Sequence, residues 1–179
     1  MQLTHRELWT AFHGMALGAG FLLAFSGAFV SLWSMRSAWV SPAGAEANAR
    51  RLVAGTCAMA LLAWLTILVG TLVIYPMYRA KPPAGTSASG LGAYPKFQLT
   101  SQPQTKEWHE FGMEWKEHVG WLVPILATAV AVVATRYRKT LVDEPQVRNV
   151  LLALLCVSFF CACVAGLLGA LINKVAPLR

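Results

Sequence analysis

Charge is what this chain has least of. Only 13% of its 179 residues are Asp, Glu, Lys or Arg, whereas a soluble domain carries about 25%. The shortage is greatest in four apolar stretches that contain no charged residue, at about 12–35, 52–75, 118–135 and 150–172. Each stretch is close to the roughly 20 residues that a helix needs to cross a bilayer. Because backbone polar groups in lipid must be satisfied within the segment, the sequence predicts an all-α membrane protein.

The chain also lacks the patterns that mark a catalytic centre. It has no HExxH, no glycine-rich phosphate loop and no Ser–His–Asp order. Its 4 cysteines all fall in predicted spans, and the spacing of Cys161 and Cys163 does not suit a chelate. The net charge of +7 comes from basic residues beside the spans, where lipid head groups explain them, so nucleic-acid binding is not expected. We therefore expect a non-catalytic membrane subunit.

The order of spans and loops predicts a single membrane domain over 1–179, an antiparallel four-helix bundle with one long external connection at 76–117. The two short loops are rich in Arg, which favours their placement in the cytoplasm. The N-terminus and the long connection are then periplasmic, in a bacterial inner membrane. The connection begins with a Pro-, Gly- and Ser-rich part that predicts an irregular loop, and the helical pattern returns at Thr105.

All 4 histidines lie on the side of the long connection: His5, His13, His109 and His118. His13 and His118 fall at similar depth on spans that run in the same direction. If those spans touch, two imidazoles can ligate one b-type haem. In helix count and histidine placement the chain is similar in outline to the four-helix b-type cytochrome subunits of membrane oxidoreductases. This similarity implies electron transport within a respiratory complex, with electrons exchanged with a quinone or a partner redox protein.

The stretch KEWHEFGMEWKEHVGW, at 106–121, gathers ionisable groups just before the third span. At helical spacing, Glu107, Glu110, Glu114 and His118 share one face, which predicts an amphipathic helix over about 105–118. In the haem hypothesis, Glu110, Glu114 and Glu117 handle protons or orient the ligands.

The same acidic face has a second interpretation as a non-haem metal site. Glu110, Glu114 and His118 would supply ligands, and His13 or His5 would complete the set. Carboxylate and imidazole groups in a four-helix bundle can hold iron, manganese or zinc. The paired Glu-x-x-His motifs of di-iron bundles are missing, which weakens this interpretation.

The main alternative to electron transfer is an accessory subunit that docks to partner subunits in the membrane or periplasm. The 105–118 helix would then be the docking surface, through Glu107, Trp108, Glu110 and Trp115. Histidines at head-group level are common without being ligands. The apolar spans would contact membrane lipids in either case.

Small residues recur at helical spacing in the first and fourth spans. Gly14 and Gly18 form a GxxxG pair, and Ala162, Gly166 and Ala170 form a similar ridge. Such ridges let helix backbones approach closely in lipid. We expect them either to pack helices together or to leave room for a flat cofactor.

Overall fold

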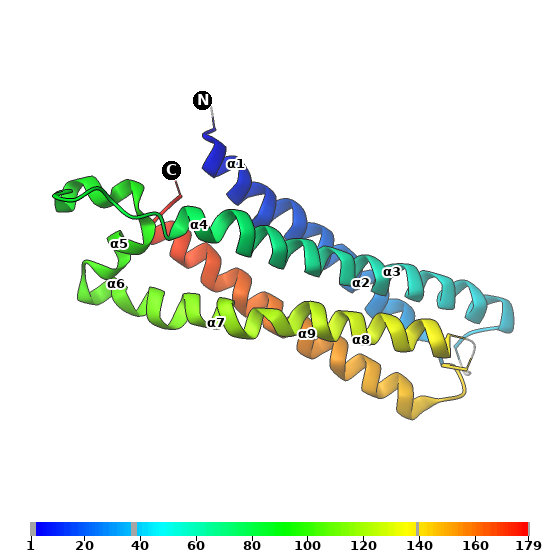
Figure 1. The fold of residues 1–179 in the computed structure, drawn as a ribbon. Helices are drawn as coiled ribbons and strands as arrows, with labels where there is room; N and C mark the ends of the chain where they lie inside the picture. The colour runs from blue at the N-terminus through cyan, green and yellow to red at the C-terminus, as the bar shows by residue number, and fades with distance from the viewer. Residues whose placement is uncertain (1–2, 37–38, 139, 179) are drawn as a thin grey trace. The chain divides into compact units, whose positions relative to one another are not determined.

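The computed structural model describes residues 3–36, 39–138 and 140–178, and the regular secondary structure of these residues is entirely helical (Figure 1). Four helices are long and apolar enough to cross a membrane: His5–Ser34, Pro42–Tyr78, Pro103–Tyr137 and Pro145–Val175. They confirm the all-helical class and suggest an integral membrane protein. The antiparallel arrangement of these helices stays a prediction.

The first three long helices are each built from shorter segments with different winding, and the fourth is one continuous α-helix. In chain order they are α1 (His5–Ala11), η1 (Phe12–Leu17), α2 (Gly18–Ser34), α3 (Pro42–Val69), η2 (Gly70–Ile74), α4 (Tyr75–Tyr78), α6 (Pro103–Glu107), η4 (Trp108–Met113), α7 (Glu114–His118), η5 (Val119–Trp121), α8 (Leu122–Tyr137) and α9 (Pro145–Val175). The segments η1, η2 and η4 are π-helical turns, and η5 is a 3-10 turn. The amphipathic segment predicted at 105–118 is thus the start of the third long helix, which begins at Pro103.

The helices extend beyond the predicted spans because local capping, rather than hydrophobicity, decides where they begin. The first helix starts at a capping box, in which Glu7 N donates to Thr4 Oγ1 at 3.2 Å and Thr4 N donates to Glu7 Oε2 at 2.8 Å. The other three begin at Pro42, Pro103 and Pro145. Proline is tolerated there because the first-turn N–H has no helical partner.

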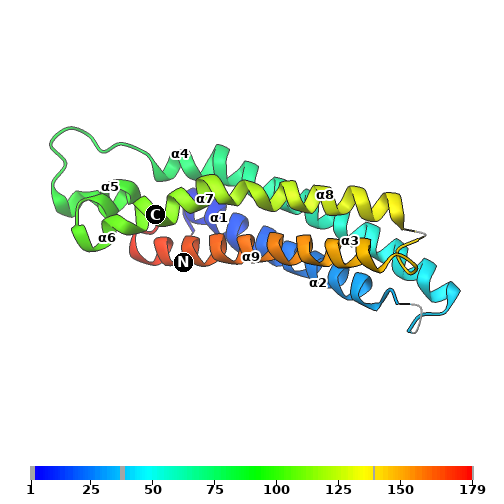
Figure 2. The same cartoon turned by 90° about the horizontal axis from the view of Figure 1, so that it is seen from below.

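The connection after the second helix is less irregular than its composition predicts. It contains a 3-10 helix, η3 (Ala88–Ala93), and a short α-helix, α5 (Pro95–Thr100). Leu99 of α5 is fully buried in a cluster with Tyr78, Met113, Ile172 and Ala176. Figures 1 and 2 both show α5 beside α6, which it contacts. One buried leucine thus ties the connection to the ends of the long helices.

The chain forms two compact units, and every long helix contributes to both. Unit 1 comprises Met1–Gly18, Leu65–Trp121 and Ala162–Arg179, and unit 2 comprises Ala19–Trp64 and Leu122–Cys161. All four histidines belong to unit 1. Outward-facing apolar side chains occur in both units, including Leu23 and Leu72 at 76% and 69% exposure. These side chains suggest contact with membrane lipid.

In unit 2, the backbones of the first and second helices pack closely at Gly55. A methyl group built on Gly55 would lie 3.2 Å from the backbone nitrogen of Ala28, so the first and second helices nearly touch there. Methyl groups on Gly14, Gly18 or Gly166 would meet no described atom within 4 Å. The glycine that permits close helix packing is therefore Gly55, which the spacing rule did not select.

Arg148 of α9 fixes the two loop ends in unit 2. Its Nη1 donates to the carbonyl oxygens of Met35, Leu141 and Val142 at 2.8, 3.2 and 3.3 Å. The side chain is only 8% exposed. These carbonyls lie where the helices end, so a helical donor is not available to them. From the sequence alone, Arg148 is only one of the basic residues near the short loops that favour a cytoplasmic location. Its hydrogen bonds to the loop carbonyls are not predicted.

We expect Arg148→Met to destabilise the protein by about 2 to 3 kcal/mol, because hydrogen bonds from a charged donor are lost and buried carbonyls are left unpaired. Unfolding of the purified protein by SDS titrated into a mild detergent, followed by circular dichroism, measures this. The exposed Arg136→Met is the matched control. Equal midpoints for the two variants would show that the Arg148 bonds do not stabilise the fold.

Candidate functional site: a polar pocket in unit 1

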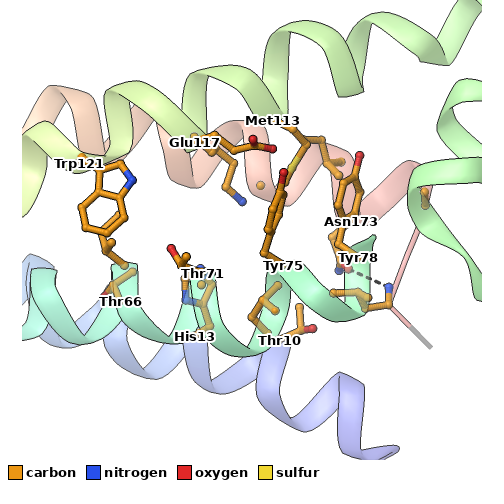
Figure 3. Close-up of a pocket in the computed structure, with 18 residues that line it drawn as sticks. Thr10, His13, Thr66, Thr71, Tyr75, Tyr78, Met113, Glu117, Trp121 and Asn173 are labelled. Atoms are coloured by element: carbon orange, nitrogen blue, oxygen red, sulfur yellow. Dashed lines mark hydrogen bonds between the residues drawn. The ribbon is translucent and has the colours of Figure 1, made fainter. Parts of the chain in front are cut away.

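Unit 1 contains a pocket of about 290 Å³ lined by side chains from all four long helices (Figure 3). The first helix supplies His13, the second Tyr75 and Tyr78, the third Lys116 and Glu117, and the fourth Asn173. Polar groups are thus gathered in one place within helices that are otherwise apolar. The pocket is our candidate functional site.

The pocket lies where the helices depart from regular α winding. His13 is in the π-helical turn η1, Thr71 in η2 and Met113 in η4, and each of these residues lines the pocket. A π-helical turn places one extra residue in a turn and re-aims the side chains that follow. Such turns occur often at functional sites. Their coincidence at this pocket supports its assignment.

His13 lies against the second helix with one ring nitrogen unused. The ring hydrogen-bonds the backbone of Thr66. Its Nδ1 is buried and has no hydrogen-bond partner among the described residues. Space for the ring depends on Gly70, because a methyl group built there would lie 3.0 Å from Cε1 of His13. Nδ1 is therefore available to a ligand in the pocket.

Glu117 and Lys116 bring both signs of charge to the pocket from neighbouring positions of α7. The Tyr75 hydroxyl hydrogen-bonds the Glu117 carboxylate, and Figure 3 shows the two side chains pointing toward each other. The other carboxylate oxygen, Oε1, is buried without a partner in the described part of the chain. One oxygen of Glu117 is thus held, and the second is free for a ligand or a proton.

Lys116 extends toward α9 rather than toward Glu117. A methyl group built on Gly169 would lie 2.8 Å from the Lys116 Nζ, so the ammonium occupies the space that any larger residue would fill. Among the described residues, Lys116 forms neither an ion pair nor a hydrogen bond. An unpaired cation in an apolar site is unfavourable unless something negative or polar joins it. This ammonium is the strongest indication that the pocket receives a ligand.

Aromatic side chains form part of the pocket wall, and two of them are hydrogen-bonded to other side chains. Tyr75, Tyr78 and Trp121 line the pocket. Tyr78 is 3% exposed, and its hydroxyl lies 2.9 Å from Nδ1 of His109. Arg79 Nη1 donates to the Tyr75 hydroxyl at 3.0 Å. The wall therefore presents aromatic rings whose hydroxyl groups at Tyr75 and Tyr78 are hydrogen-bonded.

The structure brings only one of the two predicted haem ligands to the pocket. His13 lines it, but His118 is absent from the residues described as its lining. The His118 side chain is 73% exposed. Its Nδ1 lies 2.9 Å from the backbone oxygen of Glu114 and 3.5 Å from the Glu114 carboxylate. His118 is thus not among the described residues that line this pocket, and joint ligation of one iron by His13 and His118 stays a prediction.

The acidic face does not form a metal centre in the described residues. No group of three or more His, Cys, Asp or Glu side chains in that part of the chain is placed to hold a metal ion. Glu110 instead pairs with Lys106 at 2.9 Å. Glu114 and His118 are near each other without a third ligand. The remaining histidine, His5, accepts a hydrogen bond from Trp9 Nε1 at 3.0 Å.

The predicted docking residues are divided between surface and interior. Glu107 and Glu110 are exposed. Trp108 packs against the buried cluster around Leu99, and the indole nitrogen of Trp115 is buried without a described partner. The carboxylates are thus accessible to a partner protein, whereas the tryptophans also serve the internal packing. A docking role for this helix stays a prediction.

Sequence reasoning missed Tyr75, Tyr78 and Asn173, and it gave Lys116 only a minor role. Two signals were available for the second helix: paired tyrosines at the end of a charge-free run and a glycine one turn earlier. No sequence signal links Lys116 with Gly169, because their proximity depends on how the third and fourth helices pack. Comparison with known protein families, with curated proteins and with solved structures finds no match.

We expect Tyr78→Phe to destabilise the protein by about 1 kcal/mol, because the buried hydrogen bond to His109 is lost. Detergent unfolding midpoints measure the effect. Tyr137→Phe is the control, since Tyr137 is 45% exposed. A midpoint for Tyr78→Phe no lower than that of the control would mean that this hydrogen bond does not hold the pocket wall.

Proposed function

We propose that this chain is a small integral membrane subunit for electron transfer that binds the head group of a quinone or quinol in the pocket around His13. The observation that carries the proposal is the unpaired Lys116 ammonium, which shares an aromatic-walled pocket with free atoms of His13 and Glu117. We further propose that the pocket lies near the periplasmic face of a bacterial inner membrane, in an antiparallel four-helix bundle. Membrane or periplasmic redox subunits are the expected partners.

The size of the pocket favours a single ring system. Ligand pockets usually measure about 300–1,000 Å³, and this one, at about 290 Å³, lies at the lower end. That volume suits a quinone ring better than a haem macrocycle. A quinone head group is flat and carries two carbonyl oxygens, which match aromatic walls and hydrogen-bond donors. Its apolar tail would remain among the exposed apolar side chains of the helices.

The polar groups of the pocket fit the proton chemistry of a quinol. When a quinol becomes a quinone it releases two electrons and two protons. Nδ1 of His13 can accept one proton, and the Glu117 carboxylate can accept the other. The two electrons would pass, one at a time, to a one-electron acceptor such as a haem protein bound to this subunit. Both protons are then accepted by side chains of the pocket, and both electrons are accepted by the partner protein.

We expect His13→Ala to weaken the binding of a short-chain quinone by about tenfold, because the imidazole surface that lines the pocket against the ring is lost. Isothermal titration calorimetry with decylubiquinone and with menadione, on detergent-purified protein, measures this. Gly70→Ala should weaken binding as well, since the new methyl group displaces the His13 ring.

Two controls accompany this test. Gly18→Ala places a methyl group in open space, and His5→Ala removes an imidazole that lies outside the pocket lining. Both should bind quinone as the unmodified protein does. Failure of the unmodified, folded protein to bind either quinone would reject the proposed function.

The b-type haem held by His13 and His118 remains a separate prediction. A reduced-minus-oxidised absorption spectrum with a pyridine haemochrome assay tests it directly. If both histidines are axial ligands, His13→Ala and His118→Ala each remove most of the bound haem, and His109→Ala does not. A featureless spectrum from folded, haem-supplied protein would reject the haem and leave the quinone proposal standing.

A further inference from the structure

We propose that Lys116 stabilises the one-electron-reduced, anionic semiquinone in this pocket, so that the site divides a two-electron reaction into single-electron steps. This inference rests on the proposed quinone binding and names the charged form that the pocket favours. The supporting observation is the position of the Lys116 ammonium relative to the other residues of the pocket.

The three redox forms of the ligand differ in charge. Quinone and quinol are neutral, whereas the semiquinone anion carries one negative charge shared by its two oxygens. A fixed positive charge in an apolar site strongly favours a nearby anion and has much less effect on a neutral molecule. An unpaired ammonium therefore selects the semiquinone over both other forms.

The neighbours of Lys116 do not neutralise it. His13 is close enough to interact with its charge, and an imidazole cannot supply negative charge. Glu117 supplies a carboxylate to the same pocket, but one of its oxygens is bonded to Tyr75 of the second helix. The Lys116 amine is directed instead at Gly169 of α9. Lys116 and Glu117 form no ion pair among the described residues, and the ammonium remains available to a ligand oxygen.

The resulting reaction balances in two steps. In the first, the quinol gives one electron to a one-electron acceptor protein and two protons to His13 Nδ1 and the Glu117 carboxylate. The product is the semiquinone anion beside Lys116. In the second, the anion gives its remaining electron to the reoxidised acceptor and leaves as neutral quinone. The two O–H bonds of the quinol break, an N–H bond forms at His13 and an O–H bond forms at Glu117, and no covalent bond joins the ligand to the protein.

Gly169 makes this arrangement possible and provides a variant that leaves Lys116 in place. A methyl group at position 169 would lie 2.8 Å from the present Nζ, so the ammonium must move. At Gly166, one turn earlier on the same helix, a methyl group meets no described atom within 4 Å. Gly169→Ala and Gly166→Ala therefore form a matched pair.

The experiment is a redox titration of the purified protein with bound decylubiquinone, followed by electron paramagnetic resonance of the semiquinone radical. The unmodified protein should show a radical at intermediate potentials. Lys116→Met should lower the semiquinone stability constant by at least about tenfold, because the favourable charge is removed. Lys116→Arg should retain most of the signal, and Gly169→Ala should lose part of it. Gly166→Ala and Lys106→Met should leave it unchanged.

Quinone binding by calorimetry is measured on each variant, which separates the two proposals. If the unmodified protein binds quinone but shows no radical, the semiquinone inference is wrong and the proposed function stands. An equal signal from Lys116→Met and the unmodified protein would also overturn the inference. If the unmodified protein binds no quinone, the proposed function itself fails.

Discussion

An ionisable side chain in an apolar helix bundle must be paired, solvated or used, because its desolvation is otherwise uncompensated. The pocket of unit 1 meets this constraint only in part. Thr66 bonds one side of the His13 ring, and Tyr75 bonds one oxygen of Glu117. Lys116 has no described partner at all. A packed bundle with no ligand to bind would be more stable with apolar residues at these positions, so the unpaired atoms themselves argue for an occupant.

Unit 2 shows how the same chain treats polar side chains that have only a structural role. Ser158 donates to the carbonyl of Val123 at 3.1 Å, and Trp64 Nε1 donates to Thr128 Oγ1 at 3.0 Å. The Nη1 atom of Arg148 bonds three loop carbonyls. Each of these donor atoms bonds a backbone or side-chain oxygen of the protein, whereas the Nε atoms of Arg148 and Arg36 have no described partner. Unpaired polar atoms thus occur in both units, and what distinguishes Lys116, His13 and Glu117 is that they line one pocket.

The sequence predicts the helices well and the pocket only in outline. Charge-free runs locate four apolar helices because lipid excludes unsatisfied polar groups, a constraint that depends on composition alone. The concentration of histidines on one side correctly selects the unit that contains the pocket. The partners of Lys116 and His13 are glycines on other helices, Gly169 and Gly70, which are distant in sequence. Spacing rules compare residues within one helix and cannot find such pairs.

The π-helical turn at Trp108–Met113 interrupts the regular winding on which the predicted face of the third helix depends. Placing Glu107, Glu110, Glu114 and His118 on one line assumes 3.6 residues per turn throughout. A π-helical turn adds a residue and rotates everything after it relative to everything before it. After that turn, Lys116 and Glu117 line the pocket, and His118 is exposed. The third helix thus contributes Lys116 and Glu117 to the pocket, and these groups can interact with a charged, proton-exchanging ring.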